Sequence, residues 1–473
     1  MSYTVEKIGG TSMTAFDAVL ENIILKPNDP YHRVFVVSAY GGMTDALLEC
    51  KRTGKPGVYQ KIAQGSSDWP EALKALEQRM LLVNEQWFAD PMVRLQADEF
   101  IQTRLNQAKS CIESILKACE FGQFSRADYL QDLREFLASI GEAHSAFNTA
   151  LKLTSLGINA SFVDLSGWNT AEPLPLDEVI DKAFAHRDIS KELPIVTGYA
   201  YCKEGLMNTY DRGYSEMTFS RIAVRTGAKS AVIHKEYHLS SADPRIVGPE
   251  RVRPMGQTNY DVAAELARLG MEAIHPNAAA GLKEHGITLY VKNTFEPEHE
   301  GSCITNREAS EKASVEIVAG KEKAFALHIT DVTQNHQLAQ RLDKLLAKMR
   351  IRCMGQESNG LGLTAYLYGK SGQINQLVDE LQQELSTDNI TLRTVALVSA
   401  IGAHIDCADV VSRGVKALAD NDIEVLSVQS GLHQVSVQYA IAEQDYSAAV
   451  CTLHRALISA KPNQVTQSVN RAA

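Results

Sequence analysis

A strand, a glycine turn and the start of a helix occur twice within the first fifty residues, and this pattern constrains the fold more than any other feature. The first copy begins with the short β-like run Thr4–Ile8, continues through Gly9 and Gly10, and enters a segment with apolar residues at helical spacing. The second copy begins with Arg33–Ser38 and turns at another Gly-Gly pair. Repeated units of this kind predict an α/β fold whose ligand crevice lies at the carboxyl ends of parallel strands.

The first glycine turn predicts a phosphate site. Gly9 and Gly10 let the backbone approach a ligand, and the N-terminus of the following helix offers unpaired N–H groups to an anion. Lys7, on the strand before the turn, can reach the same anion as a point charge. The lysine precedes the glycines, so the segment is not a Gly-x-x-x-x-Gly-Lys-Ser/Thr loop. Ordinary turn chemistry is the alternative, and other residues must decide between the two.

Length and composition narrow the classes of partner. A chain of 473 residues is expected to form two or three domains. Its 45% hydrophobic and 22% charged residues are typical of a soluble globular protein. The net charge of −10 argues against a nucleic acid or an acidic membrane as partner, so an anionic substrate needs cations gathered locally in its pocket.

Cysteine spacing and hydropathy indicate the compartment. The eight cysteines form no Cys-x-x-Cys pair and show no metal-ligand spacing with the thirteen histidines, which predicts reduced, mostly buried thiols. The first residues lack the apolar core of a signal peptide, and no apolar run reaches the ~20 residues that a membrane helix needs. We therefore expect a cytoplasmic protein without a membrane partner.

The chain is expected to divide into a catalytic-type domain and two smaller modules. Residues 1–305 alternate strands and helices, apart from a helical subregion at about 51–152 that would form a wall, a lid or a dimer surface. Beyond a polar linker, the element order βαββα occurs at 316–388 and recurs at 389–465. Tandem modules of this kind favour a regulatory or dimer-forming role, an analogy at the level of fold.

Four further polar clusters in the first domain would lie near the crevice. They are Ser38 with Thr44 and Asp45, Glu142 just after an expected helix at Tyr129–Ile140, the stretch Tyr210–Thr218, and the turn Ser240–Arg245. Each has a plainer interpretation: turn hydroxyls, a solvated carboxylate, a surface ion pair, or a simple turn. They predict chemistry only when they act together.

In this order the clusters resemble the aspartate kinases of the amino-acid-kinase superfamily, over nearly the whole chain. The matching motifs are Lys7-Ile-Gly-Gly-Thr-Ser, Val36-Val-Ser-Ala with Gly42-Met-Thr44, Gly141-Glu142, Arg212-Gly-Tyr-Ser215-Glu216-Met-Thr, Asp243-Pro-Arg245, Gly270 with His275-Pro276, and Val291-Lys-Asn-Thr-Phe. The C-terminal repeats resemble tandem ACT domains. The wording around Asp211 and His234 is most similar to aspartate kinases that accompany ectoine-biosynthesis genes. The resemblance implies an α/β, three-layer αβα kinase domain followed by two ferredoxin-like ACT modules.

The resemblance also implies an activity and a role for each residue. The activity is phosphorylation of the side-chain carboxylate of L-aspartate to 4-phospho-L-aspartate with ATP and Mg²⁺, in a homodimer formed through the ACT modules. The implied catalytic residues are Lys7 and Glu216, the ATP-binding residues are Lys7, Gly9, Gly10, Ser38, Glu236, Tyr237 and Arg245, and the substrate-binding residues are Thr44, Glu142, Arg212 and Ser215. No protein ligand for a metal is predicted. No general base is required, because the attacking carboxylate is ionised at neutral pH.

The sequence departs from the family pattern in three places. The usual Gly-Arg-Gly-Gly-Ser-Asp reads Asp211-Arg-Gly-Tyr-Ser-Glu, so Tyr214 adds bulk and Glu216 replaces a shorter acid. The usual Trp-Thr-Asp-Val reads His234-Lys-Glu-Tyr in this chain. Glu272 stands where a lysine is expected beside the nucleotide. Two alternatives therefore stay open: a kinase for another amino acid such as glutamate, and a catalytically impaired amino-acid-binding protein.

The sequence constrains the regulation and the metabolic pathway of this chain less than it constrains the activity. The stretch Ser427–Val437 differs from the Asn-Ile-Ser type of strand in lysine-sensitive relatives, which predicts weak or absent inhibition by lysine. Aspartate-family amino acids and ectoine are both open as end products, and neighbouring genes would distinguish them.

Overall fold

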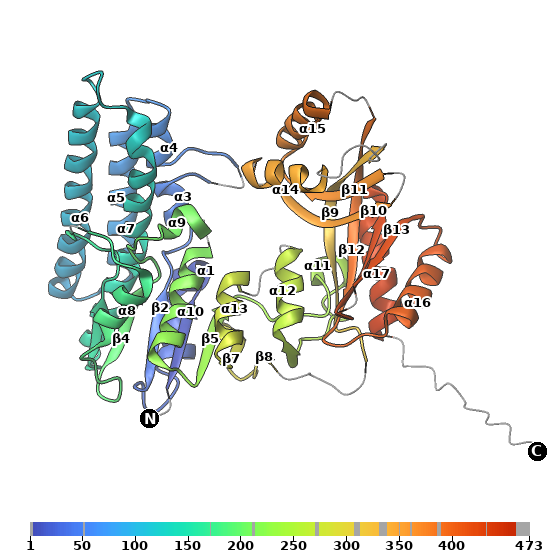
Figure 1. Cartoon of the computed structure of the whole chain (residues 1–473). Helices are drawn as coiled ribbons and strands as arrows, with labels where there is room; N and C mark the ends of the chain where they lie inside the picture. Colours follow the sequence, from blue (N-terminus) through green and yellow to red (C-terminus); the bar gives the residue numbers. More distant parts are fainter. Residues whose placement is uncertain are drawn as a thin grey trace, which may run out of the picture. The chain divides into compact units, whose positions relative to one another are not determined.

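The computed structural model consists of two compact units. The first comprises Met1–His238 and Ile274–Asn306, and the second comprises Leu239–Ala273 and Arg307–Ala473 (Figure 1). The residues that the structure describes are 3–50, 53–170, 172–210, 213–269, 274–306, 313–330, 338–349, 351–359, 362–385, 389–431 and 433–459.

The first unit is built on a mostly parallel sheet. Its strands lie in the order β3-β4-β2-β1-β5-β7-β8, and only β8 runs antiparallel to its neighbour. The bounds are β1 (Thr4–Ile8), β2 (Arg33–Val37), β3 (Ala160–Val163), β4 (Leu193–Thr197), β5 (Ser230–Lys235), β7 (Thr288–Asn293) and β8 (Ser302–Thr305). The central strands are almost wholly buried, because helices cover both faces of a parallel sheet; β2 and β4 are mostly apolar, whereas β1 carries Glu6 and Lys7. The predicted α/β class is confirmed.

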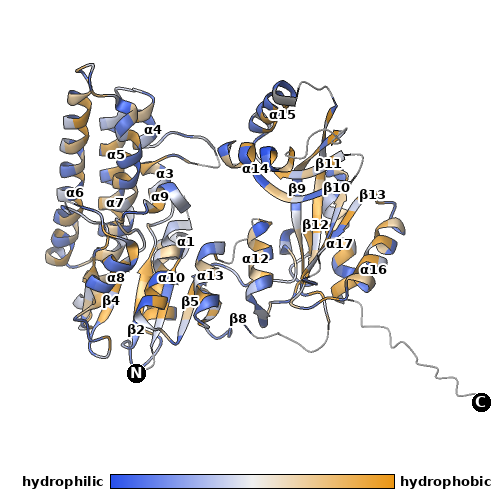
Figure 2. Ribbon diagram, viewed as in Figure 1, coloured by the Kyte–Doolittle hydropathy of each residue, from blue (hydrophilic) through white to orange (hydrophobic). Residues whose placement is uncertain are grey.

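Helices of the first unit cover the sheet and extend beyond it as a helical subregion (Figure 2). They are α1 (Gly10–Thr14), α2 (Phe16–Val19), the π-helical segment η1 (Leu20–Ile24), α3 (Met43–Leu47), α4 (Val58–Ala63), α5 (Trp69–Trp87), α6 (Pro91–Ala118), α7 (Arg126–Ser155), α8 (Leu176–Phe184), α9 (Leu206–Tyr210), α10 (Tyr214–Thr226) and α13 (Pro276–Glu284). The side chains of Asp90 and Ser125 cap α6 and α7. The expectation that a helix ends at Ile140 is wrong, because α7 continues to Ser155 and places Glu142 within it.

The second unit contains a six-stranded antiparallel sheet in the order β10-β11-β9-β12-β14-β13. Its elements are β9 (Ile317–Thr330), α14 (Leu338–Met349), β10 (Arg352–Asn359), β11 (Gly362–Tyr368), α15 (Ser371–Leu385), β12 (Ile390–Ile401), α16 (Cys407–Ala419), β13 (Val425–Ser430), β14 (Ser436–Ile441), the 3-10 turn η4 (Glu443–Asp445), α17 (Tyr446–His454) and the π-helical segment η5 (Arg455–Ser459). The element order βαββα therefore occurs twice.

The two modules share their long strands. The first half of β12 pairs with the second half of β9, and the second half of β12 pairs with the first half of β9. Strand β11 pairs with the second half of β9, and β14 pairs with the second half of β12. Each module therefore completes a four-stranded sheet with a half-strand of the other, although a boundary at 388/389 separates them along the chain.

The segment Leu239–Ala273 belongs to the second unit, although the sequence analysis included it in the domain 1–305. It contains α11 (Pro244–Val247), β6 (Gln257–Asn259) and α12 (Tyr260–Arg268). Apolar side chains of this segment form one core with the antiparallel sheet; they are Met255, Val262, Leu266 and Leu269. Periodicity could not predict which sheet this segment packs on, because the apolar spacing of an amphipathic helix is the same whatever its packing partner is.

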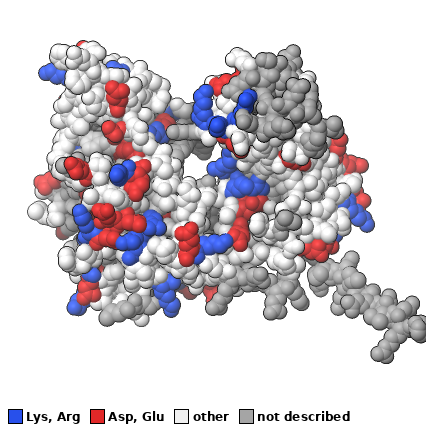
Figure 3. Space-filling model, viewed as in Figure 1, with Lys and Arg blue, Asp and Glu red and all other residues white. Residues whose placement is uncertain are grey.

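All eight cysteines lie in the part of the chain that the structure describes, and each is a free thiol. Only Cys202 is buried, so the expectation of mostly buried thiols is wrong. Among the described residues, every helix is too short or too polar to cross a membrane. Acidic and basic side chains are interspersed over the face shown in Figure 3.

Candidate active site

The two glycine turns lie against one another at the carboxyl ends of β1 and β2. The N–H of Gly9 donates to the carbonyl of His234 at 3.3 Å, which ties the first turn to β5. A Cβ on Gly10 would lie 2.6 Å from the carbonyl oxygen of Ala39, so only glycine allows this approach. The predicted phosphate turn therefore borders the second turn.

Lys7 and Glu216 form a buried ion pair at this edge of the sheet. The Lys7 ammonium lies 3.5 Å from Glu216 Oε1, and the two side chains are 8% and 13% exposed. Glu216 stands in the first turn of α10, and its other oxygen accepts a hydrogen bond from the backbone N–H of His275. Two contacts thus fix Glu216, and Glu216 in turn restrains the lysine.

Ser38 and Ser215 extend this cluster. Their hydroxyl oxygens are 3.4 Å apart, and Ser145 donates to the carbonyl of Ser38 at 2.9 Å. A Cβ on Gly198, just after β4, would lie 2.8 Å from Ser215 Cβ and 3.1 Å from Glu142 Oε1. The missing side chain at Gly198 therefore allows the serine of α10 and the glutamate of α7 to converge.

Glu142 is a buried carboxylate with one free oxygen. It is 2% exposed, and its Oε2 has no hydrogen-bond partner among the described residues. Burial raises the pKa of Glu142 to about 8, although the nearby Lys7 ammonium and a hydrogen bond from Tyr214 act in the opposite direction. An unpartnered buried carboxylate is costly, and a cationic group of a ligand would satisfy it.

Gly141 explains how α7 reaches the second turn. A Cβ at this position would lie 2.9 Å from Ala39 Cβ. The Gly141-Glu142 pair therefore combines close approach of the helix with a buried acid. The plainer interpretation of Glu142 as a solvated carboxylate is excluded by its burial.

Thr44 lies on α3, directly after the second turn. Gly42 has φ +75°, a conformation that favours glycine. Arg79, from α5, donates to the carbonyl oxygens of Gly41 at 2.8 Å and Gly42 at 3.2 Å. The helical subregion thus holds the turn that carries Thr44, and Arg79 is a contributor that the sequence analysis missed.

Glu236 and Tyr237 follow β5 on the other side of the first turn. Ser12 donates to Glu236 Oε1 at 3.5 Å, and Thr294 donates to Ser12 at 3.0 Å. Glu236 therefore lies beside the glycine turn, close to Gly9. Tyr237 is 64% exposed.

Three predicted positions are not brought into the cluster. Arg212 and Glu272 lie outside the described residues. Arg245 lies on α11 in the second unit, where its guanidinium pairs with Asp243. The cluster described here therefore consists of residues of the first unit alone.

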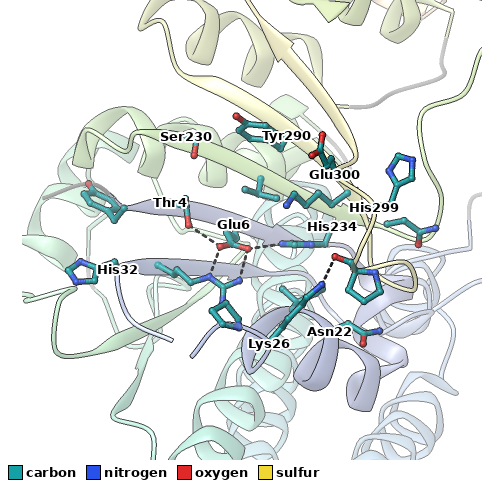
Figure 4. Close-up of a pocket in the computed structure, with 18 residues that line it drawn as sticks. Thr4, Glu6, Asn22, Lys26, His32, Ser230, His234, Tyr290, His299 and Glu300 are labelled. Carbon is teal, nitrogen blue, oxygen red and sulfur yellow. Dashed lines mark hydrogen bonds and ion pairs between the residues drawn. The ribbon is translucent and has the colours of Figure 1, made fainter. Parts of the chain in front are cut away.

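A polar cavity of about 740 Å³ opens on the opposite face of β1 (Figure 4). Glu6 alternates with Lys7 along the strand and so points away from the glycine-turn cluster. It accepts two hydrogen bonds from Arg33, at 2.6 and 2.9 Å, and lies 2.7 Å from His234 Nε2. Burial opposes ionisation of Glu6, but Arg33 and His234 outweigh it and hold the pKa of Glu6 far below its ordinary value.

The fold and the cluster define a class of protein before any relative is considered. Glycine-turn N–H groups, a buried lysine and a buried acid at the carboxyl ends of parallel strands suit phosphoryl transfer to a small polar molecule. Residues 2–293 match the sequence model described as the Amino acid kinase family, and the chain belongs to that family.

The aspartate kinases are similar over the whole chain. "Aspartate kinase Ask_Ect" of Stutzerimonas stutzeri (strain A1501) is 45% identical over 96% of this chain and 97% of its own length. "Aspartokinase 1, chloroplastic" of Arabidopsis thaliana is 24% identical over 95% of this chain and 79% of its own. The resemblance drawn from the motifs is confirmed.

A solved structure shares the fold. E. coli aspartokinase III, crystallised with lysine and aspartate, matches with a TM-score of 0.72 at 18% identity, over 96% of this chain and 99% of its own. The same enzyme with aspartate and ADP gives an equal TM-score. At this identity the likeness establishes the fold alone.

Proposed function

We propose that this chain is an aspartate kinase that transfers the γ-phosphoryl group of ATP to the side-chain carboxylate of L-aspartate. The observation that carries the proposal is Glu142, whose buried and unpartnered oxygen lies in one cluster with Lys7, Ser38 and Ser215. A buried acid that can bind a cation lies beside a lysine that can bind a phosphate. This arrangement suits a substrate that carries both an ammonium group and a carboxylate.

Lys7, Gly9, Gly10 and Ser38 bind the phosphates of ATP. The lysine compensates the charge on the γ-phosphoryl oxygens, and the backbone N–H groups of the glycine turn are already oriented before the ligand arrives. Glu216 holds the ammonium of Lys7 at 3.5 Å and keeps it directed toward the turn. We assign Glu216 to this orienting role.

Glu142 binds the ammonium group of aspartate. The guanidinium of Arg212 binds the α-carboxylate of aspartate through bidentate hydrogen bonds. Ser215 and Thr44 supply hydroxyl groups to the same pocket. Ser215 is supported by its 3.4 Å approach to Ser38, which joins the substrate side to the phosphate side.

The chemical step requires no proton transfer. An oxygen of the ionised aspartate carboxylate attacks the γ-phosphorus, the bond from phosphorus to the bridging oxygen breaks, and ADP leaves with the electron pair. The residues of the chain act by orienting the two anions and by compensating their repulsion.

Mg²⁺ would lower the negative charge of the phosphate groups, and it usually takes only one or two protein carboxylates. Within the described part of the chain there is no cluster of three acidic, histidine or cysteine side chains that could hold a metal ion. Glu236 could supply one such carboxylate, because it lies beside the first glycine turn and accepts a hydrogen bond from the hydroxyl of Ser12 at 3.5 Å. We assign Glu236 to the nucleotide-bound ion.

The nucleoside end of ATP lies beyond the first turn. Tyr237 is exposed and available to stack on a base. The protein is a cytoplasmic homodimer that associates through its ACT modules, and these modules are its regulatory part.

Release of ADP, measured by a coupled assay, tests the proposal. We expect turnover with L-aspartate, little with L-glutamate, and background without an amino acid. Preference for glutamate would assign a different acceptor, and background in all three reactions would favour the binding-protein alternative. Addition of lysine is expected to change the rate little.

A further inference from the structure

Tyr199 connects two buried carboxylates of α7. Its hydroxyl donates to Glu135 Oε2 at 2.7 Å, and its backbone N–H donates to Glu142. Tyr199 is 1% exposed and Glu135 is 8% exposed. The two glutamates are seven residues apart, so they project from the same face of the helix, two turns apart.

Glu135 also holds the backbone that leads toward Arg212. Its Oε2 accepts from the N–H of Met207 at 3.2 Å, and its Oε1 accepts from the N–H of Asn208 at 2.9 Å. Gly205, with φ +65°, precedes these residues and passes close to the same carboxylate. With the hydroxyl of Tyr199, three donors therefore converge on Glu135.

The two carboxylates differ in whether each oxygen has a hydrogen-bond partner. Both oxygens of Glu135 accept hydrogen bonds from protein groups, whereas Oε2 of Glu142 has no partner among the described residues. The ring of Tyr199 packs edge-on against Tyr214 with centroids 5.8 Å apart, and Tyr214 bonds to Glu142. A shift of Tyr199 would therefore displace the groups around Glu142.

We propose that Glu135 is a positioning residue for the amino-acid site. It fixes Tyr199 and the start of α9, and through them the surroundings of Glu142 and the segment that carries Arg212. This inference rests on the proposed function only in naming the amino acid as aspartate.

The phosphate side is held by other contacts. The first glycine turn is tied by the bond from Gly9 to His234, and Lys7 is restrained by Glu216. Within the described part of the chain, Glu135 makes its hydrogen bonds with Tyr199, Met207 and Asn208 and with none of these four residues. Loss of Glu135 should therefore affect the amino acid and not ATP.

Steady-state kinetics of Glu135→Gln test the inference. Glutamine keeps the size of the side chain but replaces one acceptor with a donor that faces N–H and O–H donors. We expect KM for aspartate to rise about 10- to 100-fold, the scale for losing a buried hydrogen bond to a charged group, and KM for ATP to change less than about threefold. Tyr199→Phe removes one donor and should give a smaller rise in the same KM.

Asp132→Asn is the matched control, because Asp132 is an exposed carboxylate on the same helix as Glu135. It should change neither KM. The effects of Glu135→Gln and Tyr199→Phe should not add in the double variant, because the two residues share one bond.

Three results would overturn the inference: an equal rise of both KM values, a lower melting temperature with both KM values unchanged, or no difference from Asp132→Asn. The wild-type rates separate this test from that of the proposed function. If the wild type prefers another amino acid, aspartate is the wrong acceptor, and the KM for that amino acid tests Glu135.

Discussion

The ammonium of Lys7 is buried beside the proposed phosphate turn and paired with Glu216. Replacing it with alanine removes a preorganised charge, so Lys7→Ala should lower kcat at least about 100-fold. The fold should survive, because Glu216 keeps its bond to the N–H of His275. ADP release and circular dichroism would check both expectations.

Lys26→Ala is the control for Lys7, because Lys26 pairs with the exposed Glu298 on the surface. Its kcat should equal that of the wild type. Near-normal turnover of Lys7→Ala would remove this residue from the mechanism.

The raised pKa of Glu142 predicts a pH dependence for aspartate use. Below about pH 8 the buried carboxyl group of the free enzyme is protonated and cannot pair with an ammonium group. The value of kcat/KM for aspartate should therefore rise about tenfold per pH unit as the pH approaches 8 from below, and then level off. Initial rates at saturating ATP would measure this profile.

Glu142→Gln should be less active and should lack this rise, because glutamine does not titrate. A profile of unchanged shape in that variant would show that another group is responsible. Glu135→Gln keeps Glu142 and should retain the rise.

At the scale of elements, strand β1 serves two tasks on its two faces. Lys7 points to the proposed site, while Glu6 joins β1 to β2 through Arg33 and to β5 through His234. Glu6→Gln would leave the Arg33 guanidinium, 12% exposed, without its counter-charge. We expect the free energy of unfolding to fall by about 3–5 kcal/mol, the usual cost of breaking a buried pair.

The loss should depend on pH with a defined sign. The pKa of Glu6 is lowered in the folded state, so below about 4.5 the unfolded chain binds a proton that the folded chain does not. The stabilisation is therefore complete above that pH and declines as the pH falls through the lowered pKa. Urea unfolding of both proteins at neutral and acid pH would measure it.

Glu298→Gln is the control, since Glu298 is 91% exposed in its pair with Lys26. Its unfolding should match that of the wild type at every pH. A gap between Glu6→Gln and the wild type that widens in acid would contradict the assignment.

At the scale of the whole molecule, the chain leaves the first unit at His238 and returns to it at Ile274. A chain truncated after Asn306 would therefore keep α12 without the sheet on which α12 packs. The exposed apolar face, which includes Val262 and Leu266, should make this truncated chain aggregate or bind a hydrophobic dye. Size-exclusion chromatography and dye fluorescence would detect either outcome.

The truncated chain with Val262→Ser and Leu266→Gln is the control, because these changes remove much of that face. It should be more soluble and bind less dye than the unmodified truncated chain. Equal behaviour of the two would show that another surface causes the aggregation.

Much of the site could be predicted from local patterns. The turn at Gly9 and Gly10, the strands β1 and β2, and the place of Lys7 just before that turn all follow from residues adjacent in sequence. Glu142 was found through its motif, although its place inside α7 was not, because nothing in the sequence after Ile140 marks where the helix ends. One feature of the sequence could have indicated Glu135: it lies seven residues before Glu142 on an amphipathic helix, and so on the same face.

The sequence by itself determined the class of fold, the repeated βαββα order and the residues of the phosphate turn, because strand and helix periods are local properties. Only the tertiary structure decided that Gly198 lets Ser215 meet Glu142, that Glu135 holds Tyr199, and that residues 239–273 belong to the second unit. Each of these depends on the path of the chain between segments far apart in sequence. Periodicity records which face of an element is buried, but it does not record what covers that face.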